Sequence, residues 1–389
     1  MSAPTRVVII GAGYAGVMAA NRLAGSPELS GSVRVSVLNR RPEFVERIRL
    51  HELAAGTRES ATVPMRSLLH ADAELIEGTA VRIDPERRRV HLASGEPTLD
   101  YDVLLYAVGS TQPAESVPSG AYGLRDPEEA RRLHARLSAL DVGATVSVVG
   151  AGATGIEAAT EIAEAYPRLR IRLISRGEIG ANLSAAGQRT IATKLAALRI
   201  ETLTHTTVQR CEDSALVTAD GRTLDSVCTV WTGGFGVPEL ASLSGLPVDE
   251  FGRLLVDETL SCPRYPNIFG AGDAILAPRK VAGHLRMSCA SALPLGAHAA
   301  QNIIALLTGK ERAPLSIGYM IACISLGRTS GLIQTLHADD RPRRFILRGR
   351  LAGITKERVC GMTLSWLRGE RRRSGSFGWP RGPRLTPTR

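Results

Sequence analysis

The sequence predicts an α/β protein with two β–turn–α–β units, and one repeated pattern carries this prediction. A buried strand at 6–10 is followed by Gly11-Ala12-Gly13-Tyr14-Ala15-Gly16, an Ala-rich helix and a second strand at 33–38. The order recurs with a strand at 145–149, Gly150-Ala151-Gly152-Ala153-Thr154-Gly155, a helix at 156–165 and a strand at 170–174. A G-x-G-x-x-G turn between a strand and a helix is typical of Rossmann-type nucleotide-binding units. We therefore expect two nucleotide sites.

Other segments show weaker but usable signals. Apolar runs predict strands, and a Pro/Gly/Ser-containing stretch at 113–123 predicts a linker between domains. A helical pattern extends from about Leu295 to Leu307, and Gly309 is its stop signal. The additional strands are expected at 75–83, 89–92, 103–107, 227–232 and 267–273.

Composition excludes several classes of protein and site. Aromatic residues make up 4% of the 389 residues, too few for a platform that stacks single-stranded nucleic acid, so no nucleic-acid partner is expected. None of the six cysteines lies in a C-x2-C pair, which argues against a dithiol centre and a clustered zinc site; we expect reduced thiols and no metal. No apolar run approaches the length of a membrane-spanning helix. We expect a cytoplasmic protein of two or three domains.

The first glycine-rich turn has a separate task for each glycine. Gly11 permits the tight turn, Gly13 lets the backbone approach a pyrophosphate, and Gly16 lets the helix pack closely on the strand. The N–H groups of the first helical turn, which includes Tyr14 and Ala15, then face the phosphate charge.

The residue after the second strand of each unit usually is an acid that binds ribose hydroxyls. The first unit has Asn39 there, followed by Arg40; an amide can still bond a hydroxyl, but without the charge. The second unit has Ser175 and Arg176. Because an arginine accommodates a 2′-phosphate, the sequence favours NADPH over NADH at the second site. A solvated surface arginine is the alternative interpretation.

Four motifs follow the order seen in the pyridine nucleotide–disulfide oxidoreductase family: 11–16, Tyr101–Ser110, 150–157 and Asn267–Asp273. Over about residues 5–310 the chain resembles this family, and most of all its branch of type II NADH:quinone dehydrogenases and related single-chain FAD reductases. The resemblance implies FAD in the first unit, NADPH or NADH in the second, Asp273 on the ribityl chain of FAD and Glu157 near the nicotinamide. The cofactor-binding residues expected are Gly11, Gly13, Tyr14, Ala15, Gly16, Asn39, Arg40, Arg49, Ala107, Val108, Gly109, Gly150, Gly152, Thr154, Gly155, Glu157, Arg176, Gly272 and Asp273.

The motifs and the linker signal together predict the domain organisation. We expect two Rossmann-type domains, an FAD-binding domain in two parts with the NAD(P)H-binding domain inserted between them, followed by a small C-terminal region. The expected ranges are 1–112 and 236–310 for the FAD-binding domain, 113–235 for the NAD(P)H-binding domain, 311–373 for the C-terminal domain and 374–389 for a disordered basic tail.

Two segments supply candidate catalytic residues. The stretch Phe44–His51 falls where the family's chain often passes near the flavin, and we consider Arg47, Arg49 and His51 as groups that meet an acidic or carbonyl substrate. The alternative is a solvent-facing helix with surface ion pairs such as Glu43 with Arg47.

The second segment precedes the 295–307 helix. In the family this helix packs under the flavin, so Cys289 is a candidate reactive thiol. A buried small hydrophobe is the alternative role for this cysteine.

The C-terminal end carries the positive charge of the chain. Residues 341–389 contain fourteen Lys or Arg and two acids, so this segment carries a charge of +12. The net charge of the chain is +10, so residues 1–340 sum to −2. Between Lys356 and Arg373, apolar residues that include Trp366 alternate with arginines, a composition that suits an interfacial helix. We hypothesise peripheral contact with the inner face of a membrane. The alternative is a core helix or a homodimer helix followed by a solvated tail.

The predicted function is an FAD-dependent oxidoreductase that passes electrons from NAD(P)H through flavin to a small-molecule acceptor, with quinone suggested by the resemblance. Family members that reduce disulfides carry two cysteines shortly after the FAD unit, and residues 40–60 contain none. Reduction through a protein dithiol is therefore disfavoured. Two alternatives stay open: a biosynthetic flavoenzyme that oxidises, oxygenates or rearranges an organic substrate, and a redox-sensing or binding flavoprotein.

Overall fold

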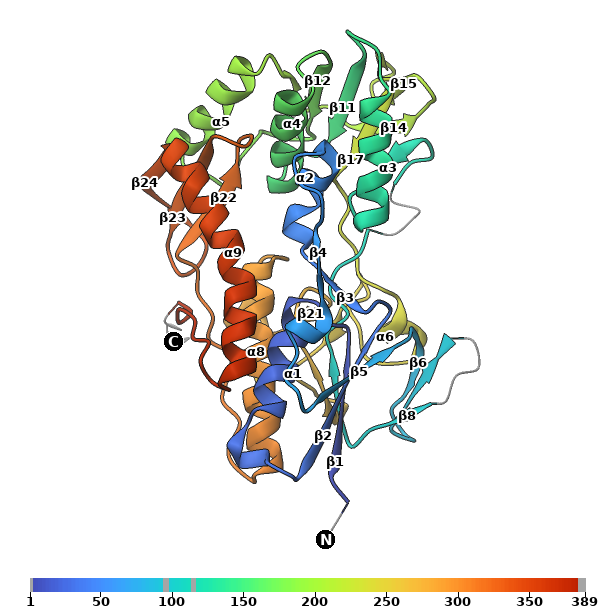
Figure 1. Ribbon diagram of the computed structural model, residues 1–389, viewed down its shortest axis with the longest axis vertical. Coiled ribbons are helices and arrows are strands. Elements are labelled where there is room, and N and C mark those ends of the chain that lie inside the picture. The colour runs from blue at the N-terminus through green and yellow to red at the C-terminus, as the bar shows by residue number, and fades with distance from the viewer. Residues whose placement is uncertain (1–2, 94–97, 113–116, 384–389) are drawn as a thin grey trace.

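The protein has an elongated α/β fold with a main sheet at each end of its long axis (Figure 1). We describe it from a computed structural model, which covers residues 3–93, 98–112 and 117–383. The sheet formed by the N-terminal strands lies in the lower half of the view in Figure 1, and the sheet formed by the middle of the chain lies in the upper half. Long helices near the C-terminus run along one side between the two halves.

The first main sheet has six strands in the order β19-β20-β9-β1-β2-β5. All neighbouring pairs are parallel except β19 with β20. β1 is buried from Val7 to Ile10, as expected for a central parallel strand covered on both faces. The strands are β1 Thr5–Ile10, β2 Val33–Asn39, β5 Ala73–Glu77, β9 Val103–Tyr106, β19 Ser261–Cys262 and β20 Tyr265–Gly270.

Helices α1 (Tyr14–Ala24) and α8 (Cys289–Leu307) pack closely beside this sheet (Figure 1). A Cβ atom at Gly296 of α8 would collide with the backbone of Ala15 in α1, so the glycine permits this approach. Ser288 caps α8 by accepting a hydrogen bond from the N–H of Ser291. The cap places the start of α8 six residues before the expected Leu295.

The second main sheet has five strands, all parallel, in the order β10-β17-β11-β12-β13. Helices α3 (Pro127–Ser138), α4 (Ala153–Ala165) and α5 (Ala185–Ala197) accompany it, and the short α2 (Leu50–Ala55) packs against α3 and α4. The strands are β10 Ala121–Tyr122, β11 Thr145–Val149, β12 Arg170–Ile174, β13 Glu201–Leu203 and β17 Cys228–Trp231.

The C-terminal part joins the two halves. Strands β22 (Ile321–Ser325), β23 (Gly331–Leu336) and β24 (Pro342–Gly349) form an antiparallel sheet, and the long helix α9 (Arg350–Arg372) packs on it and on α1. Figure 1 shows α9 descending from this sheet towards α8 and α1. Because α9 contacts elements of both halves, its residues can meet groups from each main sheet.

Short elements complete the described chain. They are β3 Glu43–Val45 with β4 Thr62–Pro64, β6 Ala80–Asp84 with β7 Arg89–Leu92 and β8 Leu99–Asp100, β14 Val208–Cys211 with β15 Ala215–Thr218 and β16 Thr223–Asp225, β18 Leu254–Leu255 with β21 Ile275–Leu276, and the helices α6 Leu240–Leu243 and α7 Arg279–Ala282.

Two expectations from the sequence are wrong here. The single strand expected at 75–83 is two strands in different sheets, β5 and β6, because the chain turns at Gly78. The disordered tail expected from 374 is ordered as far as 383: Phe377 is buried, Trp379 donates to the carbonyl of Ser316, and the N–H of Gly382 donates to the Ser316 hydroxyl. The contacts of Phe377 and Trp379 therefore order this segment in spite of its basic composition. Residues 384–389, and 113–116 of the expected linker, lie outside the described residues.

Within the described ranges, one helix, α8, is long and apolar enough to cross a membrane by length and composition, a feature that the sequence reading did not expect. However, 72% of its most apolar window is buried inside the structure. Its packing against α1 gives it the environment of a core helix.

Candidate functional site

The first glycine-rich turn forms a cradle at the carboxyl end of β1. Gly11 has a φ of +99°, and a Cβ atom there would lie 2.5 Å from the carbonyl oxygen of Ala107. A Cβ atom at Gly16 would collide with the carbonyl oxygen of Gly11. At Gly13, the residue that precedes α1, a Cβ atom would meet no atom of the described residues within 4 Å. The space beside Gly13 is thus open where the helix N-terminus points, as a pyrophosphate requires.

The second turn repeats this geometry at the carboxyl end of β11. Gly150 has a φ of +108°, and a Cβ atom at Gly155 would collide with the carbonyl oxygen of Gly150. A Cβ atom at Gly152 would meet nothing within 4 Å in the part of the chain that the structure describes. Gly152 precedes α4 as Gly13 precedes α1, and Thr154 lies in the first turn of α4. The same three constraints at both turns fit a dinucleotide at each site.

The residues expected at the ribose positions lie at the end of the second strand of the first unit and just after the second strand of the second unit. The side-chain oxygen of Asn39 accepts a hydrogen bond from the N–H of Ala12, and its amide donates to the carbonyl of Arg41. Asn39 therefore braces the first turn, and Arg40 beside it is exposed. Arg176 follows β12 in the corresponding place of the second unit and is also exposed.

Asp273 and its neighbours line the space beyond the first turn. The carboxylate of Asp273 accepts from the hydroxyl of Ser110 at 2.7 Å and from the N–H of Ser288 at 3.1 Å. Burial raises the pKa of Asp273, while Arg47 nearby opposes the rise. The preceding Gly272 has a φ of +85° and lies against Ala15. The expected contacts Ala107, Val108 and Gly109 follow β9, the strand next to β1.

Tyr14 supplies a further observation at this site. Its ring packs edge-to-face on Phe44, with 5.0 Å between centroids. Its hydroxyl is buried and has no hydrogen-bond partner in the part of the chain that the structure describes. Since a buried hydroxyl without a partner is costly, this atom suits a site completed by a bound polar group.

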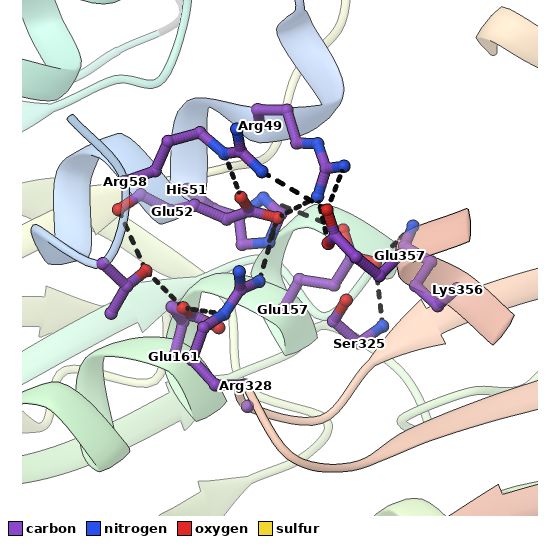
Figure 2. Close-up of polar contacts among 12 residues, drawn as sticks. Arg49, His51, Glu52, Arg58, Glu157, Glu161, Ser325, Arg328, Lys356 and Glu357 are labelled. Carbon is purple, nitrogen blue, oxygen red and sulfur yellow. Dashed lines mark hydrogen bonds and ion pairs between the residues drawn. The ribbon is translucent and has the colours of Figure 1, made fainter. Parts of the chain in front are cut away.

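A network of charges, buried at its centre and exposed at Glu357, lies between α2, α4, the β22–β23 turn and α9 (Figure 2). It balances four cationic side chains against four carboxylates from segments that are far apart in the chain. Ion pairing of this kind offsets the cost of burying charge. The cations are Arg49, Arg58, Arg328 and Lys356, and the carboxylates are Glu52, Glu157, Glu161 and Glu357.

Glu157 and Lys356 form an ion pair of this network that joins α4 to α9. The Lys356 ammonium lies 2.9 Å from Oε1 of Glu157, which also accepts from the N–H of Ser325 at 3.0 Å. Burial favours the neutral forms, but each charge stabilises the other, so the pKa of Glu157 is lowered and the pKa of Lys356 is raised. Both groups are therefore charged at neutral pH.

Glu52 is the hub of the network on α2. Its carboxylate pairs with Arg49 at 2.8 Å, Arg58 at 2.5 Å and Arg328 at 2.9 Å. Burial alone would raise the pKa of Glu52, but these partners hold it down at about 2. Arg328 also binds Glu161, whose pKa is raised by burial and whose carboxylate accepts from the Thr57 hydroxyl.

The structure decides between the alternatives for 44–51. Arg49 and His51 are buried, so the solvent-facing helix is wrong. Arg47 donates to the carbonyl of Ser110 at 2.5 Å. Arg49 binds the carboxylate of Glu357 through both terminal nitrogens, at 2.5 and 2.6 Å, and thereby ties α2 to α9.

Cys289 begins α8 beside this network. Lys356, Cys360 and Asp273 lie within electrostatic reach of its thiol, but burial dominates and raises its pKa to about 11. A thiol of this pKa is protonated at neutral pH, and Cys289 is partly buried against the core, so a small hydrophobe is the better description of this residue.

Comparisons with known proteins agree with this geometry. The model of the pyridine nucleotide-disulphide oxidoreductase family matches residues 5–301. An NADH dehydrogenase-like protein of Mycobacterium tuberculosis is 30% identical over 91% of this chain and 93% of its own length. The demethylphylloquinone reductase of a Synechocystis species is 28% identical over 93% of this chain and 95% of its own.

The chain belongs to the pyridine nucleotide–disulphide oxidoreductase family.

Solved structures share the fold of this family member. The sulfide:quinone oxidoreductase of Aquifex aeolicus superimposes with a TM-score of 0.80 at 20% identity, covering 94% of this chain and 92% of that one. The NDH2 of Plasmodium falciparum, in complex with NADH, gives a TM-score of 0.79 at 14% identity, covering 95% of this chain and 97% of that one.

Sequence reasoning missed most of the charge network of this oxidoreductase. Glu52 and Glu357 on helices and Arg328 on a turn gave no signal, because ordinary surface segments carry such residues. Lys356 did give a signal. It lies four residues from each of the buried Ala352 and Cys360 of α9, and therefore on the buried face of this helix. A lysine on an apolar stripe indicates a buried partner.

Proposed function

We propose that the protein is an FAD-dependent oxidoreductase that takes electrons from NAD(P)H and passes them to a quinone-type acceptor. The observation that carries the proposal is the same glycine cradle at the carboxyl ends of two parallel strands in one chain. Relatives named as NADH dehydrogenase-like proteins and quinone reductases support the reaction and favour it over the biosynthetic alternative. When bound, FAD supplies the capacity to take a hydride and release its electrons to a second molecule.

The FAD site is proposed at the first cradle. Gly13 and the N-terminus of α1 would hold the pyrophosphate, Asn39 a ribose, and Asp273 the ribityl chain. The orphaned Tyr14 hydroxyl and the open space beside Gly13 support this fit.

The NAD(P)H site is proposed at the second cradle, with Gly152 and Thr154 at the pyrophosphate. Arg176 would face the adenosine ribose, and its charge favours a 2′-phosphate there. Several relatives are named for NADH, so we propose that both nucleotides serve and that NADPH serves at least as well.

The domain organisation follows from these sites. We place the FAD-binding Rossmann-type domain at 1–112 and 236–310, the inserted NAD(P)H-binding domain at 113–235 and the C-terminal domain at 311–373. The two main sheets draw their strands from 1–112 with 236–310 and from 113–235 respectively, which supports these limits.

The acceptor is proposed to be a diffusible molecule and not a protein dithiol. No cysteine occurs in 40–60, and the high pKa of Cys289 makes a reactive thiolate unfavourable. Relatives from M. tuberculosis, Staphylococcus aureus and Synechocystis that are named as quinone reductases or NADH:quinone oxidoreductases support a quinone as this acceptor.

A cytoplasmic location with peripheral attachment to the inner face of the membrane is part of the proposal. One face of α9 exposes Leu351, Ile354 and Met362 together with Arg368 and Arg372. Apolar and basic side chains on one helix face suit an anionic lipid surface, where each basic residue contributes about 1 kcal/mol.

Liposome sedimentation tests this attachment. The protein should pellet with anionic vesicles at low salt and be released at high salt, and Arg368→Glu with Arg372→Glu should abolish pelleting. Charge reversal of Arg210 and Arg222, exposed on β14–β16 and its turn, is the control and should leave pelleting unchanged. Equal pelleting of both double variants would refute a role for α9. Size-exclusion chromatography of the same samples tests the homodimer hypothesis.

Anaerobic spectroscopy tests the reaction itself. The purified protein should be yellow, NADH or NADPH should bleach the flavin, and a short-chain quinone should restore the colour. A protein without flavin, or a flavin that neither nucleotide bleaches, would contradict the proposed function.

A further inference from the structure

His51 lies between two carboxylates of the network and has no role in the proposed binding of FAD or NAD(P)H. Its Nδ1 is 4.0 Å from Oε2 of Glu157, and its Nε2 is 4.0 Å from Oε1 of Glu52 (Figure 2). The two ring nitrogens thus face different carboxylates, one beside Lys356 in the interior and one on the arginine hub. An imidazole in this position can take a proton at one nitrogen and release one at the other.

The surroundings of His51 keep it neutral but ready to accept a proton. The charged groups that face it are Glu52 on α2, Glu157 on α4, Lys356 on α9 and Arg328 on the β22–β23 turn. Burial lowers the pKa of His51, and the two carboxylates oppose that shift. Nε2 has no hydrogen-bond partner within the described ranges, so no structural bond locks the ring.

The network connects His51 to solvent on the Glu52 side. Glu52 is buried, but its partners Arg58 and Arg328 are about one-third exposed. Arg328 and Glu357 line a cavity of about 380 Å³ between the β22–β23 turn and α9. A proton that enters from this cavity reaches Glu52 first, then His51, and then Glu157 in the interior.

The proposed reaction creates a need for this path, and the inference rests on that function. Oxidation of NADH by a quinone follows NADH + H⁺ + quinone → NAD⁺ + hydroquinone, so each turnover draws one proton from solvent. With ferricyanide, NADH + 2 Fe(III) → NAD⁺ + H⁺ + 2 Fe(II), and no proton is taken up. A buried site that reduces quinones therefore needs a proton entrance, and one that reduces ferricyanide does not.

We propose that His51 relays the solvent proton from Glu52 to Glu157 during reduction of a proton-accepting acceptor. In each cycle one N–H bond forms at Nε2 and one N–H bond breaks at Nδ1, which leaves the ring in the other tautomer without a change in electrons. Rotation of the ring about its Cβ–Cγ bond, which no hydrogen bond at Nε2 opposes within the described ranges, restores the starting arrangement before the next cycle. His51 touches neither nucleotide nor acceptor in this scheme and acts through Glu157.

Single-turnover kinetics with the flavin-loaded protein test the relay. The His51→Gln variant should be bleached by NADH at the wild-type rate and reoxidised by ferricyanide within twofold of it. Its reoxidation by a short-chain quinone should be at least tenfold slower, in line with the roughly 10²–10⁴-fold contribution of positioned proton transfer. The wild type should show a solvent deuterium isotope effect with quinone and none with ferricyanide. His70→Gln, a partly exposed histidine beside Asp72, is the matched control.

Each outcome is decisive. Equal slowing with both acceptors, or no slowing with quinone, overturns the relay, as does the absence of a solvent isotope effect on quinone reoxidation in the wild type. If His51→Gln does not fold, the smaller His51→Asn provides the same comparison. If NADH and NADPH both fail to bleach the wild-type flavin, the proposed function fails before the relay is reached, so the two failures are distinguishable.

Discussion

Replacing Lys356 by methionine removes the only cation bonded to the Glu157 carboxylate in the described part of the chain. Breaking a buried pair by removing one partner costs about 3–5 kcal/mol, unless the remaining charge is neutralised. In the wild type the pKa of Glu157 is held below its usual value, so the pair stabilises the fold at neutral pH. In the variant, burial is no longer opposed by the ammonium and should raise this pKa above 4.5, so that Glu157, or His51 beside it, binds a proton in the folded state.

The sign of the pH dependence follows by linkage. A folded-state pKa raised above the unfolded value gives stability that is present below the unfolded pKa and lost as the pH rises through the folded pKa. Between the unfolded and the folded pKa of Glu157 the variant should lose about 1.4 kcal/mol per pH unit relative to the wild type.

Urea unfolding of flavin-loaded protein at pH 5, 6 and 7 measures this effect. The difference in unfolding free energy between wild type and Lys356→Met should grow as the pH rises, and adding Glu157→Gln should remove that growth. Lys310→Met, which breaks the exposed pair with Glu28, should cost less than about 1 kcal/mol at every pH. A pH-independent loss in Lys356→Met would show that Glu157 is not the buried partner described above.

Three further predictions concern the cradles and the C-terminal segment. Gly13→Val should fold, since a Cβ atom there meets no described atom of the protein within 4 Å, but should lose flavin at least tenfold by absorbance; full flavin content would place the site elsewhere. Arg176→Glu should lower the ratio of kcat/KM for NADPH to that for NADH at least tenfold, and an unchanged ratio would make Arg176 a solvated residue. Glu370→Ala should lower the free energy of unfolding in urea by about 3–5 kcal/mol, because it leaves the buried Arg22 guanidinium, 2.6 Å from the Glu370 carboxylate, without its ion-pair partner. The control Glu212→Ala, which breaks an exposed pair, should cost under about 1 kcal/mol, and equal costs would refute the prediction.

The elements that could be predicted from the sequence are those fixed by local backbone demands. The turns at Gly11 and Gly150 require positive φ and close approach, so their glycine spacing alone located the strands and helices around them. The single strand expected at 75–83 is wrong because the chain leaves one sheet after Glu77 and joins another at Ala80. The pattern of apolar residues does not show this break at Gly78.

The network could not be predicted because its bonds join residues that are distant in the chain. Arg49 and Glu357 are separated by 308 positions, and arginine and glutamate are both residue types that ordinarily lie on the surface. The ordered segment after 374 failed for a related reason: composition counted its arginines and prolines, whereas Phe377 and Trp379 hold it to α8 and α9 through aromatic contacts.

The central claim is that one chain carries electrons from a nicotinamide nucleotide to a quinone through FAD held at the first cradle. Anaerobic stopped-flow absorbance on the purified protein tests it most directly, with NADH or NADPH mixed first and a short-chain quinone second. The account predicts that the nucleotide bleaches the flavin bands and that one equivalent of quinone restores them, while Gly13→Val shows neither change. A wild-type flavin that is bleached but not reoxidised by any quinone would contradict the proposed acceptor, and a flavin that is not bleached at all would contradict the claim as a whole.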